Sequence, residues 1–376
     1  MRNNYNLYDI CDYVTSRTSR IENYISTENM LPNKGGVCTP SNVPNGTAVE
    51  YKVGDILVSN IRPYFQKIWQ ADCNGACSAD VLCFRAKDKV DSKYLFYLLS
   101  QQLFFDYVMS GAKGCKMPRG DKKQIMQWGI SLPSIDVQRQ IVGVLSAIDN
   151  KIALNTRIND NLEQQAQALF DEWFVNDSTQ PAEYNRASLT DIANYLNGLA
   201  MQRFRPQSDE KAIPVLKIKE LGQGMCDSSS DICSQSIDSK YIVNDGDIIF
   251  SWSGTLLVDI WCGGICGLNQ HLFKVTSDKY PKWFVYYWTK YHLAKFIRIA
   301  KDKAVTMGHI KRGDLETSEV LIPNAEILSK MDNIIAPIFD AIISRRVENK
   351  TLATLRDTLL PKLMSGELSV EDVSVD

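Results

Sequence analysis

Two stretches of the chain carry apolar residues in the alternating three- and four-residue steps of a long amphipathic helix. The first stretch runs from Leu132 to Phe174, and the second runs from Ile322 to about Leu363. Each stretch has proline as its second residue, which is typical of a helix start because the first turn offers no partner for the missing N–H. Forty residues at about 1.5 Å each make roughly 60 Å of helix, more than a compact domain of ordinary size requires. We therefore expect two long helices that pack against each other.

Both apolar seams are interrupted by polar residues at their centres. Asn155 and Asn159 occupy the middle of the first seam, and Arg345 and Asn349 occupy the middle of the second. Buried polar residues at such positions commonly fix the register and the partner of a coiled coil, at some cost in stability. Because the two seams match if the helices run antiparallel, the pattern favours a paired coiled coil over two ordinary core helices.

The same sequence unit occurs twice, with an offset of about 190 residues. Gly54-Asp55-Ile56-Leu57 returns as Gly246-Asp247-Ile248-Ile249. Met117 and Met307 each lie 16 residues before the proline that opens a long stretch. Chance similarity does not hold one register across several landmarks, so we expect the order globular domain, long helix, globular domain, long helix.

Each globular part predicts a mixture of helices and strands. The β-branched runs that follow the two Gly-Asp turns are typical of strands. Asp91–Met109 and Asp278–Ile299 predict amphipathic helices, Val175–Ala187 predicts a linker, and Glu367–Asp376 predicts a frayed end. The expected fold class is α+β, with mixed α/β domains and an internal pseudo-two-fold repeat.

Composition limits the class of protein. A chain of 376 residues, 44% hydrophobic and 23% charged, is too long for a single core. We see no apolar run near the ~20 residues of a membrane span and no signal peptide, so we expect a cytoplasmic protein without membrane contact. The ten cysteines then predict reduced thiols. Because the net charge is −2, any nucleic-acid-binding surface must be local.

Basic residues gather at the same place in both repeats. Gly111–Lys123 and Lys290–Arg312 each hold several basic residues and only one acid. The candidate phosphate contacts in the two segments are Lys113, Lys116, Arg119, Lys122, Lys123, Lys301, Lys303, Lys311 and Arg312, and His309 is a candidate phosphate or base contact. A basic cluster usually means a solvated face, but its recurrence at one repeat position favours nucleic-acid binding.

The loops after the two Gly-Asp strands differ although their flanks match. A repeated scaffold with divergent loops is what two different base sequences require, and ordinary loop variation is the alternative. Arg62 is suited to guanine, and Asn60 or Gln270 is suited to adenine. The further candidates for DNA contact are Tyr64, Trp252, Ser253, Arg203 and Arg205.

The sequence lacks the common catalytic signatures. It contains no phosphate-binding Gly-x-x-x-x-Gly-Lys-Ser/Thr loop, no His-Glu-x-x-His helix and no Asn/Asp-Pro-Pro-Tyr/Phe motif of amino-methyltransferases. The pairs Cys73/Cys77 and Cys262/Cys266 invite a zinc interpretation, but apolar neighbours favour buried thiols. We therefore predict no catalytic residue and no metal site.

Four motifs along the chain resemble the specificity subunits of Type I restriction–modification systems. They are Leu132–Val142, Asp149–Ile152, Gln167–Phe170 with Trp173-Phe174, and Leu359–Leu368. The resemblance covers essentially the whole chain. The second long stretch departs from the pattern, because Ile322–Ile327 lacks a glutamine like Gln138.

The resemblance implies two target-recognition domains, at residues 1–132 and 177–322, each of which reads one half of a split site in double-stranded DNA. Antiparallel coiled-coil helices would separate the two domains, at 133–176 and, with the C-terminal tail, 323–376. Methylation and cleavage would belong to partner subunits, two for modification and others for restriction, which would also hold S-adenosylmethionine, ATP and Mg²⁺. The helix residues expected to dock these subunits are Gln138, Asn155, Asn159, Trp173, Arg345 and Asn349.

Two other classes of protein stay open. A stand-alone DNA methyltransferase with degenerate motifs would have to bind S-adenosylmethionine by itself. A coiled-coil scaffold without DNA binding would not need divergent loops or doubled basic segments.

Overall fold

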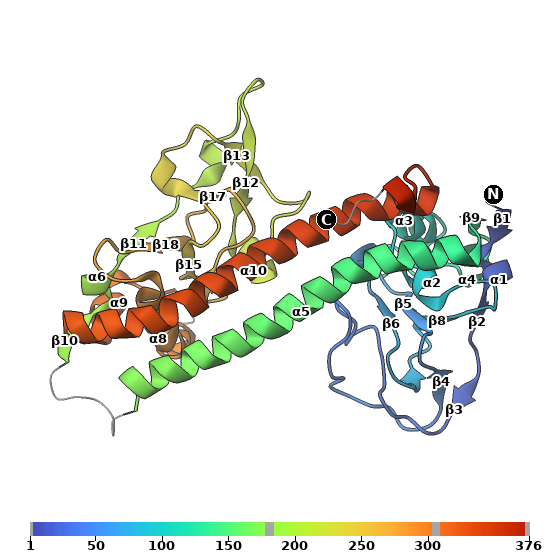
Figure 1. Ribbon diagram of the computed structural model, residues 1–376, viewed down its shortest axis with the longest axis horizontal. Coiled ribbons are helices and arrows are strands. Elements are labelled where there is room, and N and C mark those ends of the chain that lie inside the picture. The colour runs from blue at the N-terminus through green and yellow to red at the C-terminus, as the bar shows by residue number, and fades with distance from the viewer. Residues whose placement is uncertain (1–2, 177–183, 303–308, 373–376) are drawn as a thin grey trace. The chain divides into compact units, whose positions relative to one another are not determined.

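The computed structural model describes residues 3–176, 184–302 and 309–372, which form two compact units. Unit 1 comprises residues 1–150 and 354–376, and unit 2 comprises residues 151–353. The long helices α5 (Ile135–Phe174) and α10 (Ala325–Ser365) each contribute residues to both units (Figure 1). The predicted mixed α/β class is confirmed.

Unit 1 is built on a four-stranded antiparallel sheet in the order β2-β8-β5-β6. Its strands are β2 (Cys11–Tyr13), β8 (Val81–Ala86), β5 (Ile56–Ser59) and β6 (Ile68–Gln70). A smaller sheet joins β3 (Arg17–Thr18), β4 (Ala48–Tyr51) and β7 (Gly75–Cys77), and β1 (Asn3–Asn6) pairs with β9 (Gly129–Leu132). The short helices are α1 (Leu7–Ile10), α2 (Ser92–Leu99), α3 (Gln102–Ser110) and α4 (Lys122–Ile125), with 3-10 turns η1 (Pro63–Phe65) and η4 (Val370–Asp372).

Unit 2 repeats this plan with the antiparallel sheet β11-β18-β15-β16. Its strands are β11 (Asn194–Asn197), β18 (Leu272–Thr276), β15 (Ile248–Ser251) and β16 (Leu257–Ile260). The second sheet contains β13 (Ile232–Ser234), β12 (Ala212–Leu216), β17 (Cys266–Leu268) and β14 (Ile242–Val243), and β10 (Asn185–Ser188) pairs with β19 (Glu319–Ile322). The remaining helices are α6 (Leu189–Ile192), α7 (Ile218–Gln223), α8 (Lys282–Asp302) and α9 (Arg312–Glu316), with turns η2 (Met201–Arg203) and η3 (Ser239–Tyr241).

The repeated Gly-Asp turn has the same physical role in both units. Gly54 and Gly246 have φ of 89° and 86°, a left-handed conformation that glycine adopts without a steric penalty. In unit 1 the buried Asp55 carboxylate lies 2.6 Å from the Arg85 guanidinium. In unit 2, Asp247 lies 2.7 Å from the ammonium of Lys274. The turn therefore starts the central strand and fastens it to the neighbouring strand, which confirms the internal repeat.

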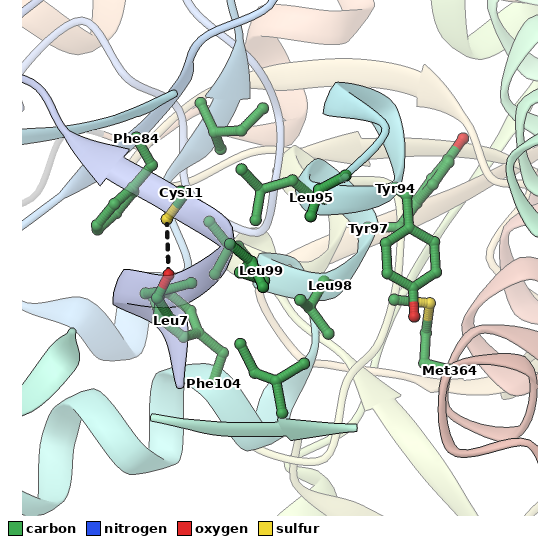
Figure 2. Packing of buried hydrophobic residues seen from close by; sticks show 14 of the residues in the cluster. Leu7, Cys11, Phe84, Tyr94, Leu95, Tyr97, Leu98, Leu99, Phe104 and Met364 are labelled. Atoms are coloured by element: carbon green, nitrogen blue, oxygen red, sulfur yellow. Dashed lines mark hydrogen bonds between the residues drawn. The ribbon is translucent and has the colours of Figure 1, made fainter. Parts of the chain in front are cut away.

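The core of unit 1 takes side chains from both ends of the chain. Leu7 and Cys11, from the first strands and helix, pack with Phe84, Leu99 and Phe104, and Met364 of α10 belongs to the same cluster (Figure 2). Helix α5 adds Ile141 and Leu145, and α10 also adds Leu360 and Leu363. Burial raises the pKa of the Cys11 thiol to about 12, so this cysteine is a core residue without a reactive thiolate.

The long helices α5 and α10 run antiparallel where they pair in unit 2. In unit 2, Asn155 of α5 donates to Asn349 Oδ1 at 2.9 Å, and Glu163, further along α5, lies 2.7 Å from Arg346. The residue number in α10 thus falls from 349 to 346 as the residue number in α5 rises from 155 to 163. Asn155 and Asn159 are both buried, so the predicted polar centre of the coiled coil is confirmed.

Two details of the sequence prediction were wrong. Asp91–Met109 is not one helix, because Ser100 Oγ bonds the carbonyl of Phe96 at 2.6 Å and Gln101 is extended, which starts a new helix at Gln102. Helix α8 begins at Lys282, after its proline, and not at Asp278. Arg345, in the middle of the second seam, donates to Ala341 O of its own helix, and its neighbour Arg346 pairs with Glu163 of α5 and Asp259 of β16.

Candidate nucleic-acid interface

In unit 1 the two segments that the sequence singled out lie against each other. The loop after β5 meets the basic segment through an antiparallel bridge between Ile61 and Arg119. The backbone N–H of Arg62 donates to the carbonyl of Pro118 at 2.9 Å. Lys113 and Arg119 exchange two backbone hydrogen bonds of 2.9 Å, which close the basic segment into a tight loop. We call residues 60–65 and 113–119 the unit-1 site.

Unit 2 makes the same junction at the equivalent positions of the repeat. Ser253, in the loop after β15, forms an antiparallel bridge with His309. The N–H of Ile310 donates to the carbonyl of Trp252 at 3.0 Å. We call residues 252–255, 270–271 and 309–310 the unit-2 site. The two candidate segments of each repeat are therefore parts of one surface, which the sequence alone did not show.

The unit-1 site carries exposed positive charge. The exposed basic residues in and beside it are Lys113, Lys116, Arg119, Lys122 and Lys123. Arg119 lies 3.2 Å from Asp80, and Lys113 lies 3.3 Å from Asp121. Exposed ion pairs of this kind are weak, so phosphates can replace them.

Asp121 has a structural task at the edge of this surface. Its carboxylate caps helix α4 by accepting from the N–H groups of Gln124 and Lys123, at 3.3 and 2.9 Å. These backbone hydrogen bonds, with a side-chain hydrogen bond from the ammonium of Lys113, lower the pKa of Asp121. The acid therefore stays charged and holds the two lysines of α4 in place beside the site.

Arg62 and Asn60 differ in their access to a ligand. Arg62 is half-buried in a left-handed conformation, with φ of 50°. Asn60 is only 5% exposed, and among the described residues its Oδ1 has no hydrogen-bond partner. A base contact by Asn60 requires the loop to move, whereas Arg62 already lies nearer the surface.

The unit-2 site groups one tryptophan with two histidines around the bridge between its segments. Trp252 donates from Nε1 to Asn197 at 2.9 Å, and its ring centroid lies 5.9 Å from that of His271 and 6.4 Å from that of His309. Ser253 Oγ lies 3.1 Å from His271 Nδ1. Gln270 Nε2 lies 3.3 Å from the other ring nitrogen of His271.

His271 was missed as a site residue. The available signal was its position directly after Gln270, itself a candidate. In contrast, His292 is a core residue that donates to Glu319 O at 2.8 Å, and burial lowers its pKa.

The other predicted DNA contacts are at the surface of unit 2. Lys311 and Arg312 are exposed at the start of α9, directly after Ile310 of the unit-2 site. Lys301 is exposed near the end of α8, and Arg203 and Arg205 are exposed around η2. Lys303 and Met307 lie outside the described residues.

The helix residues predicted to dock partner subunits are mostly used inside the units. Gln138 is 0% exposed, accepts from Asp91 N at 3.0 Å, and donates to Lys89 O and Pro133 O. Because a buried amide must be satisfied internally, these hydrogen bonds join α5 to the globular part of unit 1. Asn155 and Asn159 are likewise buried between the helices, and docking of partner subunits by these three residues stays a prediction.

Trp173, Asn349 and Arg345 also make contacts within unit 2. The Trp173 ring lies 6.3 Å from that of Trp283, and Asn349 Nδ2 donates to Ile152 O at 3.4 Å. The first contact joins α5 to α8 and the second joins α10 to α5, whereas the hydrogen bond of Arg345 to Ala341 O lies within α10.

No group of three or more His, Cys, Asp or Glu in the part of the chain that the structure describes is arranged to hold a metal ion. All ten cysteines are free thiols. Burial raises the pKa of Cys77 to about 12 and that of Cys262 to about 11, so neither thiol offers a ready thiolate ligand. In the described segments we also find no helix that is long and apolar enough to cross a membrane.

The family model for the Type I restriction modification DNA specificity domain matches residues 5–164 and again residues 181–356. The chain belongs to this family. The resemblance seen in the sequence is therefore confirmed, and the two matches coincide with the two copies of the repeat.

Two relatives of the chain are named as specificity subunits of Type I restriction enzymes. The Type I restriction enzyme MjaIX specificity subunit of Methanocaldococcus jannaschii is 28% identical over 76% of this chain and 71% of its own length. The Type I restriction enzyme HindI specificity subunit of Haemophilus influenzae is 22% identical over 92% of this chain and 94% of its own length. These proteins are named as specificity subunits, in agreement with the predicted non-catalytic role.

A solved structure supports the fold. The S subunit of the Type I restriction–modification system of M. genitalium superposes with a TM-score of 0.58 at 13% identity, covering 97% of this chain and 96% of that one. At this identity the likeness concerns the fold alone.

Proposed function

We propose that the chain is the DNA-recognition subunit of a Type I restriction–modification complex and that each site reads one half of a split target. One observation carries the proposal. The junction between the central-strand loop and the basic segment is built at equivalent positions in both units, through Ile61 and Arg119 and through Ser253 and His309.

The two sites differ in the side chains that they present. The unit-1 site offers Arg62 with several exposed cations, and the guanidinium fork suits the two acceptors of guanine. The unit-2 site offers the Gln270 amide beside Trp252 and His271, and an amide suits the donor and acceptor of adenine. One scaffold with two chemistries is what a target with two unlike halves requires.

Catalysis belongs, in this proposal, to other subunits of the complex. We assign methylation to two modification subunits, which would hold S-adenosylmethionine, and cleavage to restriction subunits, which would hold ATP and Mg²⁺. Two similar units in one chain support a pair of equivalent docking places for modification subunits. Ten free thiols fit a cytoplasmic complex.

Mapping the methylated adenines in DNA from cells that carry the complete system tests the proposal. We expect a sequence in two parts with an unspecified spacer. Arg62→Ala should relax one half only, and Gln270→Ala should relax the other half only. A lost bidentate base contact costs about 1–3 kcal/mol of discrimination, or roughly 5- to 150-fold. The proposal fails if the methylated sequence is continuous or if either variant alters both halves.

The assignment of the cofactor has its own test. The purified chain should show no heat of binding when titrated with S-adenosylmethionine and should not methylate DNA alone. Cofactor binding and DNA methylation should both be observed once the modification subunits are added. Stoichiometric cofactor binding by the chain alone would favour the stand-alone methyltransferase.

A further inference from the structure

The unit-1 site ends in a pair of exposed aromatic rings. Tyr64 is 49% exposed and Phe65 is 37% exposed, and their ring centroids lie 4.6 Å apart. Both residues belong to η1, which packs against helix α3. Large aromatic side chains normally gain free energy by leaving water, so an exposed pair at a binding surface indicates a partner with apolar faces.

The turn that presents these rings is held in place. Arg62 before it and Gln66 after it both have φ of 50°, a left-handed conformation that costs non-glycine residues free energy. Pro63 between them is buried. The carbonyl of Phe65 accepts from Asn33 N–H at 2.8 Å, and that of Gln66 accepts from Lys34 N–H at 3.0 Å. A strained turn held by two outside hydrogen bonds presents its side chains in one fixed arrangement.

Unit 2 has no such pair at the equivalent place. Its loop after β15 runs only from Trp252 to Leu256 before β16 begins, and the loop of unit 1 runs from Asn60 to Lys67. The single aromatic residue of the short loop, Trp252, is half-buried, bonds to Asn197 and packs on Phe273 at 5.7 Å. The exposed pair therefore distinguishes the unit-1 site from the unit-2 site.

The surroundings of the pair favour DNA as its partner. Arg62 directly precedes the turn, and the bridge from Ile61 to Arg119 brings the exposed cations of the basic segment to the same loop. A duplex offers apolar base faces between two rows of phosphates, and proteins use apolar wedges beside phosphate contacts to unstack a base step.

We propose that Tyr64 and Phe65 insert at one base step in the half-site read by unit 1, and that they unstack and kink the duplex there. Outside the adenine that is methylated, the half-site read by unit 2 stays stacked. This inference rests on the proposed function. It assigns to the aromatic pair a deformation of DNA, which would favour flexible pyrimidine–purine steps at a position without hydrogen-bonded base contacts.

The test uses the complex of this chain with its modification subunits and a duplex carrying the methylated sequence found by mapping. The duplex bend is measured by circular-permutation electrophoresis, and stacking is measured by 2-aminopurine fluorescence at successive positions outside the methylated adenines. We expect a bend of at least about 20° and a fluorescence increase confined to one half-site. Tyr64→Ala with Phe65→Ala should abolish both signals and weaken binding about 10- to 100-fold.

Two matched variants serve as controls. Tyr64→Phe keeps the ring and should keep the bend, and Tyr8→Ala removes an exposed aromatic ring of α1, outside the site, and should change nothing. If the double variant misfolds by circular dichroism, Tyr64→Ala alone serves, because the ring is half exposed.

The proposal that Tyr64 and Phe65 insert into DNA is contradicted if a folded variant without the rings bends and binds DNA as the wild type does. It is also overturned if such a variant fails to assemble with the modification subunits, because the partner of the rings is then a protein. Failure of the proposed function looks different, since the wild-type complex would then show no sequence-specific binding at all.

Discussion

Changing Lys113, Lys116, Lys122 and Lys123 together to alanine is expected to weaken DNA binding at least about 100-fold at low salt. The four side chains are exposed at and beside the unit-1 site, and phosphates can replace the exposed ion pair of Lys113 with Asp121. Each phosphate contact that is lost should flatten the dependence of log K on log salt concentration by about 0.9. Because phosphates carry no sequence information, cognate and random duplexes should lose affinity alike.

The measurement is a salt titration of binding by the complex with its modification subunits. The matched control changes four exposed lysines outside both sites, which are Lys52, Lys240, Lys330 and Lys362. This control lowers the net charge by the same amount but at positions away from both sites. Equal losses in the two variants would show that net charge, and not the basic segment, governs binding.

Phe170→Ala is expected to destabilise unit 2 by about 3–5 kcal/mol, the usual cost of removing a buried phenylalanine. The Phe170 ring of α5 is fully buried, with the rings of Phe174, Trp288 and Tyr287 at centroid distances of 5.2, 5.2 and 5.6 Å. Its loss leaves a cavity where α5 joins the aromatic face of α8. Urea unfolding followed by tryptophan fluorescence should show a lower midpoint for the transition of unit 2.

Leu154→Ala is the control for this effect. Leu154 lies on the same helix and in the same unit but is half exposed, so its truncation should cost about 0.5 kcal/mol or less. Similar losses for the two variants would mean that α5 is not part of the core of unit 2.

The long helices and the repeat were predictable because their signals are periodic. Apolar spacing over forty residues has few alternative interpretations, and the buried Asn155 and Asn159 lie where the seam turned polar. The break between α2 and α3 was not predictable from periodicity, because it depends on one hydroxyl that bonds Phe96 O. The sequence also did not show that Arg346, next to Arg345, pairs with Glu163 of α5. Neighbouring residues differ by a rotation of about 100° around a helix, so a small change in register decides which side chain reaches the partner.

The candidate sites were predictable as separate segments but not as surfaces. Sequence comparison of the two halves found the divergent loops and the basic clusters. That Ile61 meets Arg119, nearly sixty residues away, depends on how β5 and the segment before α4 fold together. Burial could not be predicted either, so Gln138 and Asn60 were named as candidate contacts with other molecules although both are buried. Polar residue types suggest function, and only packing shows whether they are accessible.

Unit 1 is built from two separate segments of the chain, which has a consequence for folding during synthesis on the ribosome. Its core needs Leu360, Leu363 and Met364, although the first segment of unit 1 ends at residue 150. Unit 2 is one uninterrupted segment, residues 151–353. At about 5–20 residues per second, more than 200 further residues take roughly 10–40 s to emerge. The part translated first therefore waits with an open apolar face while the part translated second can finish. We therefore expect this interval to be the stage at which the nascent chain exposes the most apolar core surface.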